Sequence, residues 1–200
     1  MMVTARTITL CILASLVLVA CGSSPPVHYY ALAPMSAEPR QEANDPVILG
    51  LGPLSMPEYL NRSQIVTRGA GAEMNVDEYS RWAEPLGPAV HRIISTDVDN
   101  LLDGVVVVAF PYDSMIRAQV DYRVLGEVSR FDADHSGQVI LDVLWTISEV
   151  GADIVVAPHR SQYKAQAASA GNSAAMAEAM NEALLLFSQD IASKLDAVLK

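Results

Sequence analysis

The feature that most constrains the fold is a pair of long segments, residues 118–129 and 138–148, in which apolar and polar residues alternate. The apolar positions recur at every second residue or nearly so: Ala118, Val120, Tyr122, Val124 and Val128, then Val139, Leu141, Val143, Trp145 and Ile147. A period of two is the spacing at which the side chains of a β-strand share one face. The two segments therefore predict neighbouring strands of an antiparallel sheet, with Trp145 on the covered face and polar residues on the other.

Two further segments have the three- and four-residue apolar spacing of an amphipathic helix. The apolar positions of the first are Trp82, Leu86, Val90, Ile93, Ile94, Val98, Leu101 and Leu102, and those of the second are Met176, Met180, Leu184, Phe187, Ile191, Leu195 and Val198. Pro85 and Pro88 fall in the first two turns of the first helix, where a missing N–H costs least, and Gly104 can end it. The second stripe is also compatible with a coiled coil, but packing of one helix on its own sheet is the more frequent explanation.

The remaining strands are predicted from short apolar or β-branched runs between turn residues. They are residues 28–32, 47–51, 64–68, 73–77 and 105–110, and a last strand from 154–157 and 163–167, with a break after residue 51 at Pro53 to Pro57. The order of elements predicts an α+β fold with two layers, a mostly antiparallel β-sheet and two main helices packed on one face.

The N-terminus has the features of a lipoprotein signal peptide. Arg6 precedes an apolar run, Ile8 to Ala20, that is short for a transmembrane helix. The run ends in Leu18-Val19-Ala20-Cys21, which matches the lipobox pattern of aliphatic and small residues before a cysteine. We expect cleavage before Cys21, diacylglycerol on its thiol and an acyl chain such as palmitate on its freed amine. Two or three chains make detachment from a membrane very slow.

The leader divides the chain into a signal peptide (1–20), a lipid-anchored tether with a candidate first strand (21–45) and one α+β domain (46–200). Gly22 and Ser23 follow the anchor, and no Asp does. Lipoproteins without that Asp are usually sorted to the outer membrane, so we expect the domain on its periplasmic side.

Cysteine usage and charge exclude several function classes. The chain has 2 cysteines, Cys11 in the signal peptide and Cys21, so the processed domain is expected to have no free thiol, disulfide or cysteine metal site. The formal net charge of −10 is a poor match to nucleic acid or to a bare anionic membrane surface. An acidic domain of this kind suits contact with other proteins.

No catalytic signature is present in the sequence. It has no Gly-x-Ser-x-Gly elbow, phosphate loop or His-Glu-x-x-His motif, and its four histidines are scattered. Asp132 to Gly137 resembles the start of a calcium loop, but Val143 occupies the position of the required bidentate Glu, so a polar hairpin loop is the better interpretation. We expect no enzyme activity, no metal site and no cofactor besides the lipid on Cys21.

The segment from Tyr59 to Arg68 combines aromatic and cationic residues in an otherwise acidic chain. One interpretation is a turn and a strand whose arginines face solvent or balance acids such as Glu58. The other is a partner-binding surface, because Tyr and Arg are frequent interface anchors. The candidate partner-binding residues are Tyr59, Arg62, Gln64, Arg68 and Trp82.

Five segments resemble the ABC-type transport auxiliary lipoproteins, the PqiC family. They are the lipobox, Tyr29-Tyr30-Ala31-Leu32, Met56-Pro57-Glu58-Tyr59-Leu60, Arg62-Ser63-Gln64-Ile65-Val66-Thr67-Arg68 and Arg81-Trp82-Ala83-Glu84-Pro85-Leu86. The strand pair with its tryptophan and the C-terminal helix are also similar. The resemblance covers nearly all of the chain after the signal peptide.

The resemblance implies a non-enzymatic outer-membrane lipoprotein. It also implies two partners, an MCE-domain protein that bridges the periplasm and an inner-membrane transport component, in a system that moves lipids or maintains membrane integrity. The alternative is a periplasmic module that carries phospholipid in its own pocket, which a large apolar cavity with polar groups at its mouth would favour. An envelope hydrolase is a third hypothesis and requires a Ser or Asp beside a His in a cleft. A homo-oligomer is compatible with all three.

Overall fold

The computed structural model describes residues 25–36, 44–151 and 157–200. The strands are β1 (His28–Tyr30), β2 (Val47–Ser55), β3 (Gln64–Arg68), β4 (Met74–Trp82), β5 (Val105–Ala109), β6 (Tyr122–Asp134), β7 (Gln138–Glu149) and β8 (His159–Gln166). The helices are the 3₁₀ turn η2 (Glu58–Leu60), α2 (Leu86–Leu101), the single-turn α3 (Ser114–Arg117) and α4 (Ser173–Leu199). The signal peptide and Cys21 lie outside the described residues.

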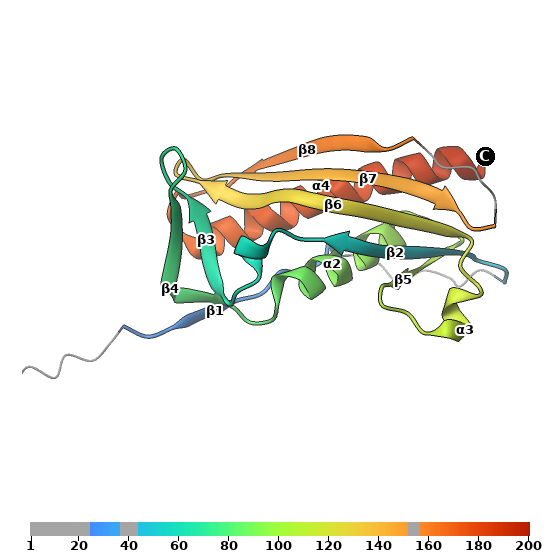
Figure 1. Ribbon diagram of the computed structural model, residues 1–200, viewed down its shortest axis with the longest axis horizontal. Helices are drawn as coiled ribbons and strands as arrows, with labels where there is room; N and C mark the ends of the chain where they lie inside the picture. The colour runs from blue at the N-terminus through green and yellow to red at the C-terminus, as the bar shows by residue number, and fades with distance from the viewer. Residues whose placement is uncertain (1–24, 37–43, 152–156) are drawn as a thin grey trace, which may run out of the picture.

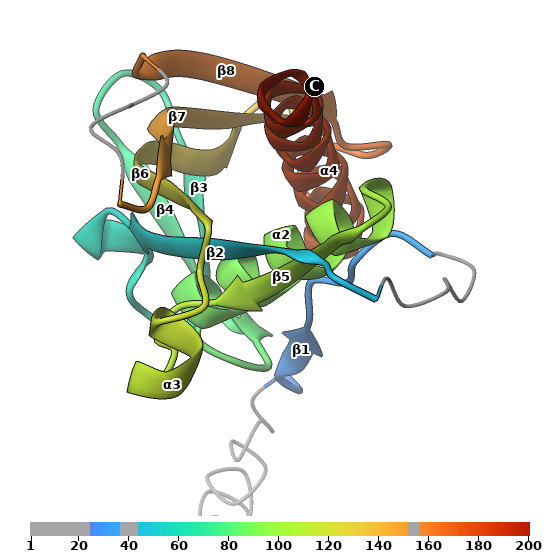
Figure 2. The ribbon, with the colours of Figure 1, turned by 90° about the vertical axis from the view of Figure 1, so that its right-hand side faces the viewer.

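All eight strands belong to one mixed sheet, which confirms the predicted α+β fold. The longest pairings, β6 with β7 and β7 with β8, are antiparallel, as is β3 with β4. Parallel pairing joins β2 to β5 and β6, β3 to β6, and β1 to β4. The sheet curves around α2 and α4, which contact each other and cover one face of it (Figures 1 and 2).

The alternation from Tyr122 to Ser129 and from Gln138 to Ser148 lies in β6 and β7, which contact α4. The predicted first strand is wrong for residues 118–121, which precede β6, and Ala118 is exposed at the C-terminal end of α3. Trp145 is 1% exposed, and its ring packs edge-on against Phe187 of α4 with 5.4 Å between the ring centroids. The stripe of α4 is buried from Met176 to Leu195, but Val198 is 39% exposed at the C-terminal end. The helix therefore packs on its own sheet along most of its length, which is the interpretation preferred over a coiled coil.

Several predicted element boundaries differ from the structure, among them the end of the first strand, both ends of the strand predicted at 73–77 and both ends of the strand predicted at 118–129. Three further differences have a clear physical reason or bear on the site. Strand β2 continues through Gly52 and Pro53 to Ser55, because a register shift between Leu51 and Leu54 in its pairing with β6 accommodates the proline. Helix α2 begins at Leu86, and Trp82 instead ends β4 in register with Tyr30 of β1. The last strand is β8, which begins at His159, whereas residues 154–156 of the predicted strand lie outside the described residues.

Glycine 126 lies where β6 approaches both β7 and β2. A Cβ atom at this position would lie 2.9 Å from the carbonyl oxygen of Leu144, 2.9 Å from Cδ2 of Leu54 and 3.1 Å from Cβ of Trp145. The Leu144 oxygen is backbone and cannot move without disturbing the pairing of β6 with β7. The sheet therefore requires glycine here because of space.

We expect Gly126→Ala to lower the free energy of unfolding by about 1 to 3 kcal/mol, the usual cost of overpacking. Urea denaturation followed by circular dichroism measures this. Glu127→Ala, at the exposed neighbouring position, is the matched control and is expected to leave the transition unchanged. A Gly126→Ala protein as stable as the parent would contradict the close approach of the three strands.

Candidate functional site

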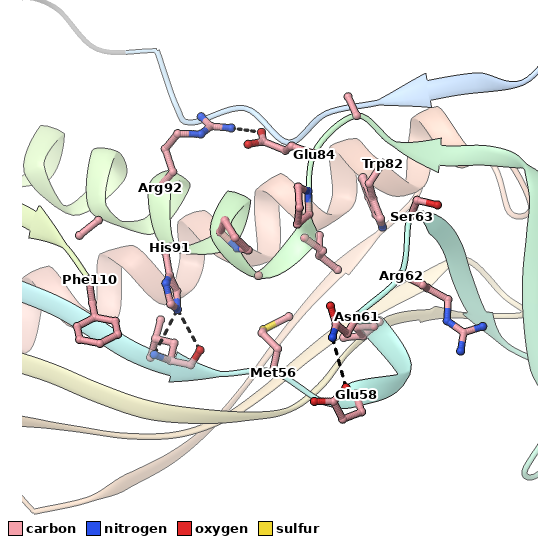
Figure 3. A pocket seen from close by; sticks show the side chains of 18 of the residues that line it. Met56, Glu58, Asn61, Arg62, Ser63, Trp82, Glu84, His91, Arg92 and Phe110 are labelled. Carbon is pink, nitrogen blue, oxygen red and sulfur yellow. Dashed lines mark hydrogen bonds and ion pairs between the residues drawn. The ribbon is translucent and has the colours of Figure 1, made fainter. Parts of the chain in front are cut away.

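An open groove of about 780 Å³ lies between the N-terminal turn of α2, the 3₁₀ turn η2 and the segment that follows β5 (Figure 3). Its walls come from segments far apart in sequence. Leu54 and Met56 come from β2 and the residues after it, Trp82 from the end of β4, and Phe110 from the segment after β5. These segments meet because β2 is paired with β5 and because α2 packs on both of these strands.

The floor of the groove is apolar. Leu54, Leu60, Trp82 and Leu86 are all 6% exposed or less, so they form the surface of the core at this point. Met56 is half-buried and packs against the core. Exposed prolines extend the apolar wall toward solvent: Pro85, Pro88 and Pro111. A surface of this kind can accept apolar groups of a ligand without rearrangement of the core.

The rim of the groove is polar, and most of its charged groups are paired. Arg92 of α2 forms an ion pair with Glu84 (Figure 3). Asn61 donates to Glu58 across η2 at 3.4 Å. Arg62 is exposed, and its guanidinium has no hydrogen bond or ion pair with any residue that the structure describes. Arg62 is thus the cation of the rim that is available for an external anion.

His91 is held by the backbone of β2. Its Nε2 lies 3.2 Å from the Leu54 nitrogen and 3.0 Å from the Leu54 oxygen. The imidazole therefore links α2 to β2 beneath the groove, and its Nε2 is not directed at a serine or aspartate. The contact pattern of His91 is that of a structural histidine.

A second polar cluster lies on the opposite face of the sheet from α4 and contains Tyr59, Arg68, Arg130 and Asp132. The carboxylate of Asp132 accepts a hydrogen bond from Tyr59 Oη at 2.7 Å, from Arg68 Nη2 at 2.8 Å and from Arg130 Nε at 2.8 Å. Asp132 is 1% exposed. Arg68 also lies over the ring of Tyr59, with 5.9 Å between Cζ and the centroid. The cluster ties η2, β3 and β6 together.

The cluster changes the pKa values of its members. Burial acts to raise the pKa of Asp132, but the hydrogen bonds from Arg68, Tyr59 and Arg130 outweigh it and hold the pKa below its usual value. Burial, together with the hydrogen bond to Asp132, raises the pKa of Tyr59 to about 12. The hydrogen bond to Asp132 raises the pKa of Arg68. All of these shifts favour a carboxylate, a neutral phenol and a guanidinium at neutral pH.

The calcium-loop segment forms the end of β6 and its turn, so the polar hairpin interpretation is correct only for its second half. Asp132 lies inside β6 and is directed at the arginines. Asp134 Oδ1 accepts from the backbone nitrogens of Ser136 and Gln138 at 2.8 and 3.1 Å and so closes the turn. Among the residues that the structure describes, no group of three or more His, Cys, Asp or Glu side chains is placed to hold a metal ion.

The sequence model of the ABC-type transport auxiliary lipoprotein component family matches residues 30–192. The chain belongs to this family. The name of the family associates its members with ABC transport systems. A lipoprotein of such a system is a membrane-anchored periplasmic protein. Within the described residues of this family member, no helix is both long and apolar enough to span a membrane.

Solved structures support the fold of the family member. Protein XCC0632 from Xanthomonas campestris, described as DUF330, has a TM-score of 0.64 and 18% identity, with 85% of this chain and 99% of that chain covered. An uncharacterized protein has a TM-score of 0.69 and 17% identity, with 86% and 99% covered. A search of the curated proteins gave no significant match.

The five residues predicted for partner binding fall into three places. Arg62 and Trp82 line the groove. Tyr59 and Arg68 bind Asp132, so Arg68 does balance an acid, but that acid is Asp132 rather than Glu58. Gln64 Nε2 lies 3.5 Å from Glu78 Oε2 on the neighbouring strand. Sequence reasoning missed Met56, His91 and Phe110 of the groove, because nothing in their local spacing indicates that they converge.

Proposed function

We propose that the protein is anchored in the outer membrane through lipid on Cys21, faces the periplasm and docks an MCE-domain partner of a lipid transport system through the groove. The observation that carries the proposal is the open apolar floor next to Arg62, whose guanidinium has no partner in the described part of the chain. Membership in a family of transport auxiliary lipoproteins supports the proposed setting. The scarcity of catalytic motifs and the backbone contacts of His91 support a non-enzymatic role.

The groove suits a protein segment with apolar side chains and a carboxylate. Leu60, Trp82 and Leu86 offer a preformed apolar surface on which such side chains lose contact with water. Arg62 can form two parallel hydrogen bonds with a carboxylate at the edge of the contact. An apolar centre with a polar rim is the usual anatomy of a protein interface.

Charge reversal at Arg62 tests the docking proposal. In the full lipidated chain, we expect Arg62→Glu to weaken binding of the MCE-domain partner by about 2 kcal/mol, roughly thirtyfold, through loss of the ion pair and repulsion. Co-purification from membranes and a titration with the purified partner measure this. Arg160→Glu, at an exposed position on β8, is the matched control. Full partner binding by Arg62→Glu with an unchanged melting curve would exclude the groove rim as the docking site.

The anchor is tested separately. We expect Cys21→Ser to leave the melting curve of the domain unchanged but to release the protein from the membrane fraction, because the acyl chains supply the membrane affinity. Fractionation and intact mass measure the two effects. Lipidation of Cys21 would be contradicted if the variant still sedimented with the outer membrane and the parent carried no acyl mass.

A phospholipid carrier is the second candidate function, and the size of the groove favours it. About 780 Å³ is within the usual range for small-molecule pockets. Lipid extraction followed by mass spectrometry of the purified, detergent-free protein distinguishes the candidates. A carrier retains non-covalent phospholipid that Met56→Glu loses, whereas a docking groove yields none in either protein.

A further inference from the structure

The margin of the sheet formed by β1 and β4 carries three large exposed side chains, Val27, Tyr29 and Tyr79, which we call the tyrosine margin. Their exposed fractions are 38%, 65% and 44%. Tyr29 is in register with Arg81, so these two side chains lie on the same side of the sheet. Tyr79 lies in the part of β4 between Asp77 and Arg81, where the register with β3 shifts. Ser80 and Trp82, on the other side, are buried. The three side chains of the tyrosine margin are therefore not part of the hydrophobic core.

The chemistry of the tyrosine margin suits the polar–apolar boundary of a bilayer. A tyrosine ring is apolar along its body and polar at its tip, which is why tyrosines concentrate where a membrane meets water. Arg81 adds a guanidinium whose Nε is buried and has no hydrogen-bond partner among the described residues. The carboxylate of Asp77 is occupied by the backbone nitrogens of Tyr79 and Ser80 at 2.9 and 3.2 Å. Glu78 remains exposed, which favours a zwitterionic surface over an anionic one.

The length of chain before β1 limits how far this margin can lie from the anchor. Five residues lie between Cys21 and Val27, so the six steps from one Cα to the next span at most about 20 Å even when fully extended. Strand β1 lies at one margin of the molecule, and the C-terminal end of α4 lies at the opposite corner (Figure 1). A lipid on Cys21 therefore keeps the β1 margin within this reach of the membrane, and it sets no such limit on the end of α4.

We propose that the tyrosine margin is a membrane-contact surface: Val27, Tyr29 and Tyr79 enter the headgroup region of the bilayer that holds the lipid of Cys21. The inference rests on the proposed lipidation of Cys21 and adds to it a fixed orientation of the domain. The acyl chains supply the affinity, and the tyrosine margin sets which face of the domain meets the bilayer. The groove then has a constant position relative to the membrane when the partner arrives.

Depth-dependent quenching tests the orientation in the full lipidated chain. Neither native cysteine leaves a free thiol after processing, so Tyr79→Cys and Val198→Cys each accept one fluorophore. The proteins are reconstituted in phosphatidylcholine and phosphatidylethanolamine vesicles that contain a phospholipid brominated near the headgroup. We expect quenching of the label at position 79 and none at position 198, which is 39% exposed at the end of α4. Val27→Cys provides a second label on the margin if Tyr79→Cys does not fold.

The outcomes separate the orientation from the anchor. Protein that floats with the vesicles but shows no quenching at position 79 or 27 overturns the membrane-contact surface and leaves the anchor intact. Protein that does not float and carries no acyl mass overturns both. Adding Tyr29→Ser to the labelled Tyr79→Cys protein is expected to reduce quenching while flotation is unchanged, and equal quenching with and without Tyr29 would also overturn the proposal.

Discussion

Replacing Trp145 by alanine is expected to lower the free energy of unfolding by about 3 to 5 kcal/mol, the usual cost of removing a buried large aromatic side chain. The ring is 1% exposed and lies between Phe187 of α4 and the strands beneath it. Its Nε1 donates to Ser161 Oγ of β8 at 3.1 Å. The substitution therefore opens a cavity between the helix and the sheet and leaves one hydroxyl without its donor.

Chemical denaturation followed by far-UV circular dichroism measures this loss. The matched control is Leu144→Ala, because Leu144 precedes Trp145 on β7, points to the other face and is 36% exposed. A change at such a surface position is expected to stay within about 0.5 kcal/mol. If both variants unfold at the same denaturant concentration as the parent, the assignment of Trp145 to the covered face is wrong.

The sequence predicts the elements with long, regular periodicity. Strands β6 and β7 and helix α4 each span several repeats of their own period, so one irregular residue does not hide the pattern. The sequence predicts Trp82 at the start of a helix because its distance from Leu86 fits one helical turn, yet Trp82 ends β4. The last buried residue of a strand and the first buried residue of the helix that follows it can lie four residues apart by coincidence.

Pairing direction is not encoded in local spacing. Strand β2 lies between β5 and β6 and is parallel to both, although β5 and β6 follow it much later in the chain. Only the crossover through α2 makes the parallel neighbour β5 possible. The groove depends on these pairings, so the sequence predicts Arg62 and Trp82 as binding residues but does not predict that they converge with Phe110.

A bulge in β6 explains why the sequence pattern does not predict the environment of Asp132. The register shifts between Val128 and Arg130, so the inward positions change from Val124 and Val128 to Phe131 and Ala133. Asp132 therefore stays on the outer face of a strand, where two arginines and a tyrosine cover it. Without the shift, the alternation through residue 128 would place Asp132 on the covered face, so the sequence pattern does not predict its cluster with the arginines on the outer face.

Removing the Asp132 carboxylate is the second change with a large expected effect. Breaking a buried ion pair by removing one partner commonly costs about 3 to 5 kcal/mol, because the other charge remains without compensation. The side chains of Arg68 and Arg130 are 32% and 22% exposed, so water relieves part of this penalty. We therefore expect Asp132→Asn to lower the free energy of unfolding by about 2 to 3 kcal/mol at pH 7. Asp196→Asn, at a half-exposed site on α4, is the control.

The same carboxylate predicts a pH dependence of stability. The pKa of Asp132 is lower in the folded protein than in the unfolded chain, where it is about 3.9. A group with a depressed folded-state pKa contributes its full stability above the unfolded pKa and loses it as the pH falls through the folded pKa. The parent should therefore lose stability steeply below about pH 4, and the difference between parent and Asp132→Asn should shrink there. A difference that stays constant from pH 7 to pH 3 would show that Asp132 is not ionised in the folded protein.

The ion pair with Asp132 distinguishes the expected effects of substitutions at Arg68 and at Arg62. Arg68 forms its ion pair inside the protein, so Arg68→Glu is expected to lower the melting temperature, and any loss of partner binding would follow from that. Arg62 has no such contact with the described residues, so Arg62→Glu should bind the partner less tightly with an unchanged melting curve. In the Asp132→Asn background the penalty of Arg68→Glu should shrink, because Arg68 has already lost its carboxylate, whereas the effect of Arg62→Glu on partner binding should be unaltered. A double-mutant cycle measures this coupling, and a cycle that couples Arg62 rather than Arg68 to Asp132 would contradict the separation of the groove rim from the buried cluster.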